Sequence, residues 1–161
     1  MTRGAQKQNL WSQLCANSET PAQIAVRMRN PRRMTVTRLR TGRLAEARAA
    51  EHLASLGYEI LARNARTKYG ELDLVARDRR ALVFVEVKAE RAGSKVGPER
   101  PVLWVTPRKQ IQVRRLAVAW IAERREAGSA LRYAEIRFDA VGVLLDRDDV
   151  VLEIDHIVGA F

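Results

Sequence analysis

The sequence predicts an α/β domain in which a central mixed β-sheet is flanked by helices. Apolar residues recur with helical spacing in two segments, and runs with strand spacing lie between and after those segments. The resulting order is helix, three strands, helix, two strands, which is typical of one mixed sheet covered by helices. At 161 residues, the chain is long enough for one such domain with a short extension.

Both helices are predicted by an apolar stripe between a capping residue and a glycine. Thr41 can cap the first helix, and Gly57 follows its last turn. Thr106 caps the second helix, Pro107 occupies its first position, and Gly128 ends it. We therefore expect helices over residues 41–56 and 106–127.

The strands are predicted by alternation between turn signals. The first is expected before a polar turn at 64–70, and in the second Leu72 and Leu74 alternate with Asp73. The run from Val83 to Val87 is the strongest strand signal in the chain. The predicted strands cover residues 58–62, 71–76, 81–89, 132–145 and 150–157.

The charge of the chain is concentrated near its N-terminus. The sequence has 29 Lys and Arg against 19 Asp and Glu, a formal net charge of +10. Residues 1–40 hold eight basic residues and one acidic residue, whereas residues 41–161 have a net charge of only +3. We interpret residues 1–40 as a basic, disordered arm, or as sequence that precedes a true start at Met28 or Met34. An organelle transit peptide is a third interpretation. Residues 41–161 form the predicted domain.

Composition excludes several classes of protein. A single cysteine, Cys15, excludes an internal disulfide and a thiolate zinc site, and two histidines make a histidine metal site improbable. No apolar run reaches the roughly 18–20 residues of a membrane span, and the N-terminus lacks a secretory signal. We expect a cytoplasmic protein with no membrane partner. The net charge of +10 indicates a polyanionic partner, and nucleic acid is the first such partner to consider.

Four charged residues occupy positions at which burial should penalise them. Glu46 lies on the apolar stripe of the first helix, and Asp73, Glu86 and Lys88 lie within strands. A buried charge is costly unless it is paired or bound to a metal. Converging carboxylates without Cys or His favour a hard cation, Mg²⁺ or Mn²⁺. Glu86 and Lys88 share a strand face, so the ammonium would lie beside such an ion, where it could activate water.

The same residues carry a resemblance. The segment 70–74 (GELDL), the thirteen residues from Asp73 to Glu86, and the segment 84–88 (FVEVK) resemble the YraN-like uncharacterised protein family. Further similar segments lie over residues 42–46, 57–58, 106–109, 137–139 and 160–161. That family is placed in the PD-(D/E)XK nuclease superfamily, near archaeal-type Holliday junction resolvases. The resemblance covers residues 41–161 and leaves the N-terminal arm outside it.

The resemblance implies a restriction-endonuclease-like core in which Glu46, Asp73 and Glu86 hold the metal and Lys88 is the catalytic lysine. The implied activity is metal-dependent hydrolysis of DNA phosphodiester bonds, with branched DNA as one expected substrate. Two features depart from the superfamily pattern. The proline of its name is absent, and residues 89–91 (AER) replace the small polar residue and arginine that usually follow the lysine. The alternative is a non-catalytic nucleic-acid-binding protein on the same fold.

The second helix offers cations for a nucleic-acid backbone. Lys109 lies on its apolar stripe, pointing toward the sheet, while Arg108, Arg114 and Arg115 make the rest of the helix basic. Neutralising phosphates supplies most of the non-specific affinity for nucleic acid. For Arg114 and Arg115, an ordinary solvated face is an equally good interpretation. A two-fold symmetric DNA junction would favour a homodimer.

Overall fold

The computed structural model describes residues 31–93 and 105–161. By its internal contacts the chain divides after Arg38, and the contacts below belong to the unit Leu39–Phe161. Residues 1–30 of the predicted N-terminal arm lie outside the described residues. Within the described part of the chain, no helix is long and apolar enough to cross a membrane.

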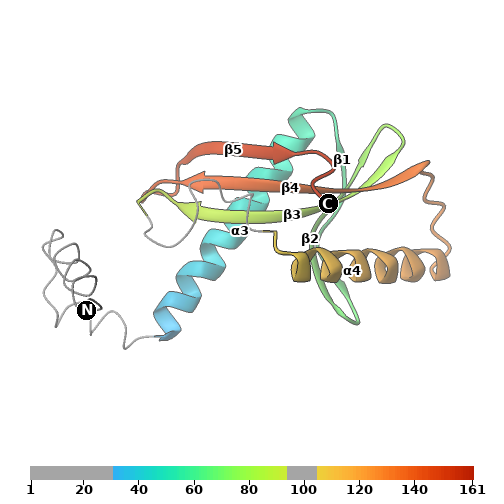
Figure 1. The fold of residues 1–161 in the computed structure, drawn as a ribbon, viewed down its shortest axis with the longest axis horizontal. Coiled ribbons are helices and arrows are strands. Elements are labelled where there is room, and N and C mark those ends of the chain that lie inside the picture. The colour runs from blue at the N-terminus through green and yellow to red at the C-terminus, as the bar shows by residue number, and fades with distance from the viewer. Residues whose placement is uncertain (1–30, 94–104) are drawn as a thin grey trace, which may run out of the picture. The chain divides into compact units, whose positions relative to one another are not determined.

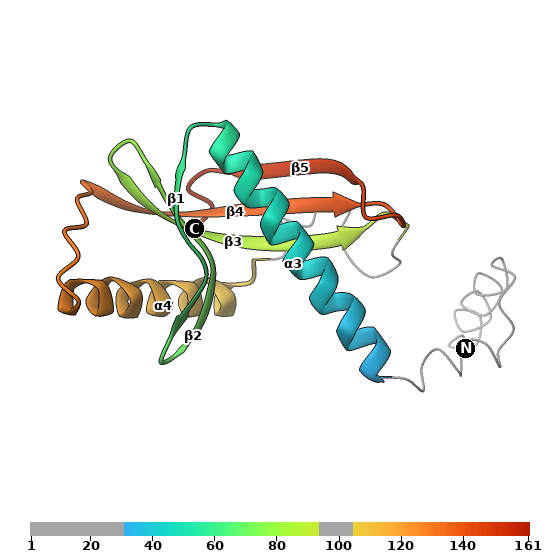
Figure 2. The ribbon, with the colours of Figure 1, turned by 180° about the vertical axis from the view of Figure 1, so that it is seen from behind.

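Two helices and five strands make up the described fold (Figure 1). The helices lie on opposite sides of a single sheet, as the two views in Figures 1 and 2 show. The predicted α/β class, a central mixed sheet flanked by helices, is therefore confirmed. The elements are α3 (Pro31–Ser55), β1 (Glu59–Thr67), β2 (Gly70–Asp78), β3 (Ala81–Arg91), α4 (Pro107–Glu126), β4 (Glu135–Leu145) and β5 (Val151–Ile157).

The strands follow one another across the sheet in chain order, β1-β2-β3-β4-β5. Three pairs, β1–β2, β2–β3 and β4–β5, are antiparallel. The pair β3–β4 is parallel, and α4 makes the crossover between them. A parallel pair requires such a crossover because the chain must return to the same end of the sheet.

Each helix buries an apolar stripe against its own face of the sheet. On one face, Ala45, Ala49 and Leu53 of α3 pack against strand residues that include Val83 and Val85. On the other, Leu116 and Trp120 of α4 pack against a second set of buried side chains, which includes Leu82, Phe84 and Val75. The strand alternation divides β3 between these two cores, so that Glu86 points to the same side as Phe84.

The sheet separates into two parts between β2 and β3. Their backbone pairing ends at Leu74 and Val85, although both strands continue. Beyond this point β2 pairs with β1 only, and β3 pairs with β4 only. In Figures 1 and 2 the β1–β2 hairpin curves away here and passes α4. We call this point the fork, and Asp73 and Glu86 are the first residues beyond it.

Two element boundaries differ from the prediction by five residues or more. The first helix begins at Pro31 rather than at Thr41, because no helix breaker separates these residues and proline is tolerated in a first turn. The first strand continues to Thr67 through the predicted turn. It is an edge strand, so its polar residues can reach water, and Asn64 adopts a positive φ of 48° within it.

Candidate active site

Glu86 is a buried carboxylate held by two lysines at the fork. Its side chain is 4% exposed. Lys88, on the same strand face, places Nζ 2.7 Å from Glu86 Oε1. Lys109, from the first turn of α4, places Nζ 3.1 Å from Glu86 Oε2. Each carboxylate oxygen of Glu86 therefore has its own ammonium partner.

The start of α4 positions Lys109. Thr106 caps the helix, and its hydroxyl accepts a hydrogen bond from the backbone N–H of Lys109 at 3.3 Å. Pro107 fixes the backbone of the first helical position. With the first turn held in this way, the Lys109 side chain extends toward β3 and reaches Glu86. The structure thus places Lys109 beside the acidic residues. The other cations predicted to bind a nucleic-acid backbone, Arg108, Arg114 and Arg115, lie elsewhere.

Asp73 bridges the fork with its side chain. Its Oδ2 accepts a hydrogen bond of 2.8 Å from the backbone N–H of Val87, just beyond the last paired residues of β2 and β3. Burial, followed by the nearby charge of Glu86, raises the pKa of Asp73 from 3.8 to about 7. The Val87 N–H and the Lys109 ammonium lower this pKa, and Glu46 raises it further. Asp73 is thus poised between its two protonation states near neutral pH.

Glu46 approaches the same carboxylates from α3. It follows Ala45 on the buried stripe of that helix, and a hydrogen bond joins its side chain to that of Asn64. Within the described residues, its Oε2 is the buried side-chain oxygen or nitrogen that has no hydrogen-bond partner. Burial raises the pKa of Glu46, with further increases from Glu71 and Glu86, while Asn64 and Arg43 lower it.

Together these residues form what we call the fork cluster: Glu46, Asp73, Glu86, Lys88 and Lys109. When all five are ionised, three negative charges meet two positive charges. One negative charge then remains uncompensated in a partly buried place, which is costly. A proton on Asp73 can remove it, and so can a bound cation.

The donor set fits a hard divalent cation in its chemistry. Mg²⁺ and Mn²⁺ take oxygen ligands, and the unpartnered Oε2 of Glu46 is such a ligand. Asp73 and Glu86 would complete the set. In the described part of the chain, no group of three or more Asp, Glu, His or Cys side chains lies close enough together to hold a metal ion without rearrangement. Glu86 would have to exchange a lysine contact for the ion.

The predicted cations of α4 other than Lys109 lie elsewhere. Arg114 places its guanidinium over the rings of Phe138 and Phe161, at 5.5 and 5.6 Å from their centroids. Arg108 and Arg115 are exposed on the outer side of the helix. Arg91, three residues after Lys88, is held by the backbone oxygen of Asp146 at 2.7 Å and is not part of the fork cluster.

A second buried charged cluster lies on β4 where its pairing with β5 begins, and its central residue, Asp139, is the register partner of Val85 on β3. Asp139 is fully buried and accepts hydrogen bonds from Arg137 Nε at 2.9 Å and from the backbone N–H of Gly159 at 2.9 Å. His156 Nε2 lies 3.0 Å from its other oxygen. Arg137 also contacts Asp78 at 3.0 Å. We call this set of contacts the Asp139 cluster.

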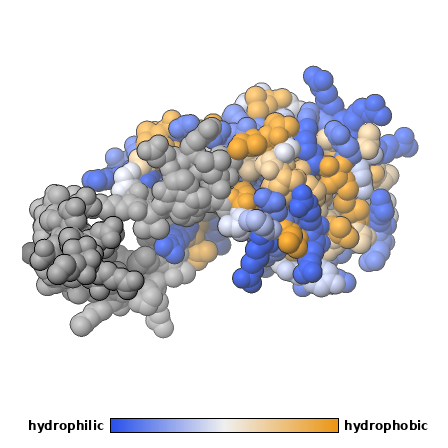
Figure 3. All heavy atoms as spheres, viewed as in Figure 1, coloured by the Kyte–Doolittle hydropathy of each residue, from blue (hydrophilic) through white to orange (hydrophobic). Residues whose placement is uncertain are grey.

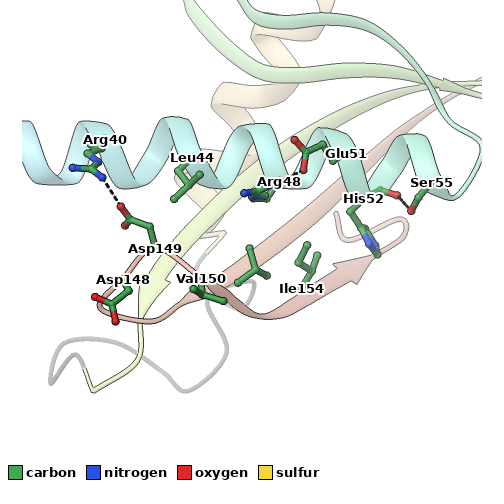
Figure 4. Close-up of a pocket in the computed structure, with 11 residues that line it drawn as sticks. Arg40, Leu44, Arg48, Glu51, His52, Ser55, Asp148, Asp149, Val150 and Ile154 are labelled. Carbon is green, nitrogen blue, oxygen red and sulfur yellow. Dashed lines mark hydrogen bonds and ion pairs between the residues drawn. The ribbon is translucent and has the colours of Figure 1, made fainter.

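A separate groove of about 980 Å³ lies between α3 and β5 (Figure 4). Four of its charged residues form two ion pairs: Arg40 with Asp149 at 2.7 Å, and Arg48 with Glu51 at 2.8 Å. Ser55 donates to the backbone oxygen of His52. These residues do not bring several carboxylates together as the fork cluster does.

Asn64 is the residue of the fork that the sequence analysis did not assign to the site. It was expected in a polar turn, whereas the structure places it in β1, within reach of Glu46. No spacing rule relates a strand residue to a helix residue before the fold is known. The left-handed backbone at Asn64, which asparagine tolerates better than most residues, is consistent with its identity.

Comparison with known proteins gives one consistent result. The sequence profile of the uncharacterised protein family UPF0102 matches residues 45–143, a span that includes the whole fork cluster. A UPF0102 protein of Acidothermus cellulolyticus is 44% identical over 125 residues, covering 74% of this chain and 92% of that protein. One of Moorella thermoacetica is 41% identical over 128 residues, covering 80% and 100%. One of Mycobacterium sp. (strain JLS) is 44% identical over 127 residues, covering 78% and 87%.

Proposed function

The chain belongs to the uncharacterised protein family UPF0102, and we propose that it is a metal-dependent endonuclease that hydrolyses phosphodiester bonds of DNA. The observation that carries the proposal is the fork cluster. Three carboxylates from α3, β2 and β3 and two lysines meet where the sheet opens. Stability alone does not account for a cluster with excess negative charge, because apolar side chains of similar volume often stabilise a fold as well or better.

Glu46, Asp73 and Glu86 would hold Mg²⁺ or Mn²⁺. When bound there, the ion would polarise the scissile phosphodiester and make water a stronger nucleophile at neutral pH. The raised pKa of Asp73 fits this role, because a carboxyl that gives up its proton readily at pH 7 can exchange it for a cation. Asn64 would keep the carboxylate of Glu46 in place through the hydrogen bond between the two side chains.

The lysines supply positive charge on either side of Glu86. Lys88 is 28% exposed, so its ammonium can reach a phosphate oxygen or orient a water molecule without leaving the fork. Lys109 is equally exposed and approaches from α4. Both ammonium groups are positioned to stabilise negative charge that develops on a phosphoryl group.

The direct test is cleavage of four-way-junction and linear duplex DNA with and without Mg²⁺. We expect Mg²⁺-dependent cutting by the wild-type protein and a loss of at least about a hundredfold in Glu86→Gln, which keeps the shape but removes the charge. Glu153→Gln is the matched control, because Glu153 is exposed on β5. Faster cutting of the junction than of the duplex would identify branched DNA as the preferred substrate.

Metal binding has its own readout. Mg²⁺ should raise the unfolding temperature of the wild-type protein, since a ligand that binds only the folded state stabilises it. The rise should be lost in Glu86→Gln and kept in Glu153→Gln. If neither protein cuts any DNA while both bind it equally, the enzyme proposal is wrong and the non-catalytic nucleic-acid-binding alternative replaces it. That alternative is favoured by the present pairing of both Glu86 oxygens with lysines.

A further inference from the structure

The outer side of α4 and the tip of the β1–β2 hairpin form a groove of about 1320 Å³. Apolar side chains line it and remain exposed: Ile111 by 54%, Val118 by 70% and Tyr69 by 66%. Figure 3 shows hydrophobic side chains between hydrophilic ones on the side of the molecule that carries α4. This apolar stripe is separate from the buried stripe that packs on the sheet.

The charges along this groove are separated by sign. Lys68 of the hairpin tip and Arg114, whose guanidinium lies over the Phe138 and Phe161 rings, also line the groove. Arg108 and Arg115 lie in the N-terminal half of α4, and Glu123 and Glu126 lie near its C-terminal end. Among residues 31–93 and 105–161, none of these four side chains has an ion-pair partner within the chain. The outer side of α4 is therefore basic at one end, acidic at the other, and apolar in the middle.

The two cations next to the acidic end are held by aromatic residues. Arg124 places its guanidinium 5.1 Å from the centroid of the Trp120 ring. Arg125 donates a hydrogen bond of 3.1 Å to the hydroxyl of Tyr133. Neither lines the groove, whereas Glu123 and Glu126 do.

We propose that the outer side of α4 is the interface of a homodimer, in which the α4 helices of two copies pack antiparallel across a two-fold axis. A two-fold axis reverses the helix direction, so the basic end of one copy meets the acidic end of the other. An antiparallel register centred near residue 117 places Arg108 opposite Glu126 of the second copy. The exposed apolar residues then cover one another along the roughly 30 Å length of the helix.

Charge complementarity favours a second copy over nucleic acid in this groove. A polyanion that follows the groove from Arg108 would meet Glu123 and Glu126 at the other end and be repelled there. The apolar middle offers Ile111 and Val118, which do not bind phosphate. A second copy satisfies the basic end, the acidic end and the apolar middle together.

The test is charge exchange between two single variants of the full chain, followed by sedimentation velocity over a concentration series without DNA or Mg²⁺. In Arg108→Glu, the new carboxylate at position 108 of one copy repels Glu126 of the other copy. In Glu126→Arg, the new guanidinium at position 126 of one copy repels Arg108 of the other copy. We expect about tenfold weaker dimerisation for each variant, because both symmetric contacts are lost and replaced by repulsion. An equimolar mixture of the two restores opposite charges at both contacts and should dimerise like the wild type.

Arg147→Glu is the matched control, since it makes the same charge change at an exposed position in the β4–β5 turn. It should leave the dimer unchanged, and circular dichroism should show all variants folded. A wild-type protein that stays monomeric, or a mixture that fails to recover, overturns the proposal. Loss of DNA binding in Arg108→Glu and a gain in Glu126→Arg, without recovery on mixing, would instead assign the groove to nucleic acid. None of these results depends on cleavage, so the proposed nuclease function is tested separately.

Discussion

Asp139, which is buried, and Asp73, which is partly buried, are carboxylates of one sheet that differ in how fully their charge is satisfied. Asp139 receives hydrogen bonds on both oxygens, from Arg137, the Gly159 N–H and His156. Burial alone would raise the pKa of Asp139, but these hydrogen bonds together lower it. Asp73 is partly buried, its neighbours include two further carboxylates, and its pKa rises to about 7. The protein can therefore satisfy a buried carboxylate fully, and it leaves this one incompletely satisfied.

The difference separates structural charge from functional charge. The Asp139 cluster joins β2, β4 and the chain end through fixed partners, which is the arrangement expected of a structural network. The fork cluster has excess negative charge, an unpartnered oxygen on Glu46, and lysines that remain partly exposed. Perturbed carboxyl groups of this kind mark sites where a ligand or a reaction completes the charge balance.

The largest expected effect is on the Asp139 cluster. Arg137→Ala removes the main partner of Asp139, a fully buried carboxylate, and also removes the contact between Arg137 and Asp78. We expect a loss of about 3–5 kcal/mol in the free energy of unfolding, the usual cost of leaving a buried charge uncompensated. Denaturant unfolding measures it, with Arg77→Ala as control. Arg77 pairs with Glu59 on the surface, so its removal should cost no more than about 1 kcal/mol. Equal losses in the two variants would contradict the structural role of Asp139.

The next largest effect is the pH dependence that Asp73 contributes. Its raised pKa, about 7 against an ordinary 3.8, means that between these values the folded protein keeps a proton that the unfolded chain has lost. The free energy of unfolding therefore falls as pH rises through this window. In metal-free buffer, Asp73→Asn should gain on the order of 2 kcal/mol relative to the wild type between about pH 5 and about pH 8.

The Asp139 cluster should behave in the opposite sense. The lowered pKa of Asp139 contributes stability that is fully present above the ordinary pKa of an aspartate, 3.8. This stability is lost as pH falls from that value through the lowered pKa. Unfolding measured against pH in the wild type and in Asp73→Asn separates the two. If both proteins show the same slope between about pH 5 and about pH 8, the raised pKa of Asp73 is wrong.

The sequence predicted most of the fork cluster because charges within apolar patterns are conspicuous. Glu46, Asp73, Glu86 and Lys88 were recognised from their positions on a buried stripe and on strands. Period and alternation also predicted the two helices and the five strands in their order along the chain. The end of the β2–β3 pairing at Leu74 and Val85 could not be predicted, because no local signal marks where two strands stop pairing.

The residues that the sequence placed less well depend on that tertiary feature. Lys109 was expected to point toward the sheet, but its contact with Glu86 follows from where the fork lies. Asn64 was expected in a turn, since its polar neighbours concealed an edge strand. Its contact with Glu46 joins two elements that only packing brings together.

A smaller effect is expected from Glu86→Gln on stability. Lys88 and Lys109 lose their shared counter-charge, but both are 28% exposed and can turn to water. We expect a cost of about 1 kcal/mol, well below that of Arg137→Ala. Because the charge of Glu86 raises the pKa of Asp73, the pH window of Asp73 should also move to lower pH. A loss as large as that of Arg137→Ala would make Glu86 a structural residue like Asp139.

The smallest expected effect concerns the support of Glu46 by Asn64. Asn64→Gly keeps the left-handed backbone, which glycine adopts without strain, and removes only the side chain. The lost hydrogen bond should cost about 0.5–1 kcal/mol. In a Glu46→Gln background the cost should be smaller, because a neutral side chain depends less on the amide than a carboxylate does. Unfolding of the two single variants and the double variant gives the coupling directly. Additive effects would mean that Asn64 serves the β1 backbone alone, and that Glu46 owes its position in the fork to α3.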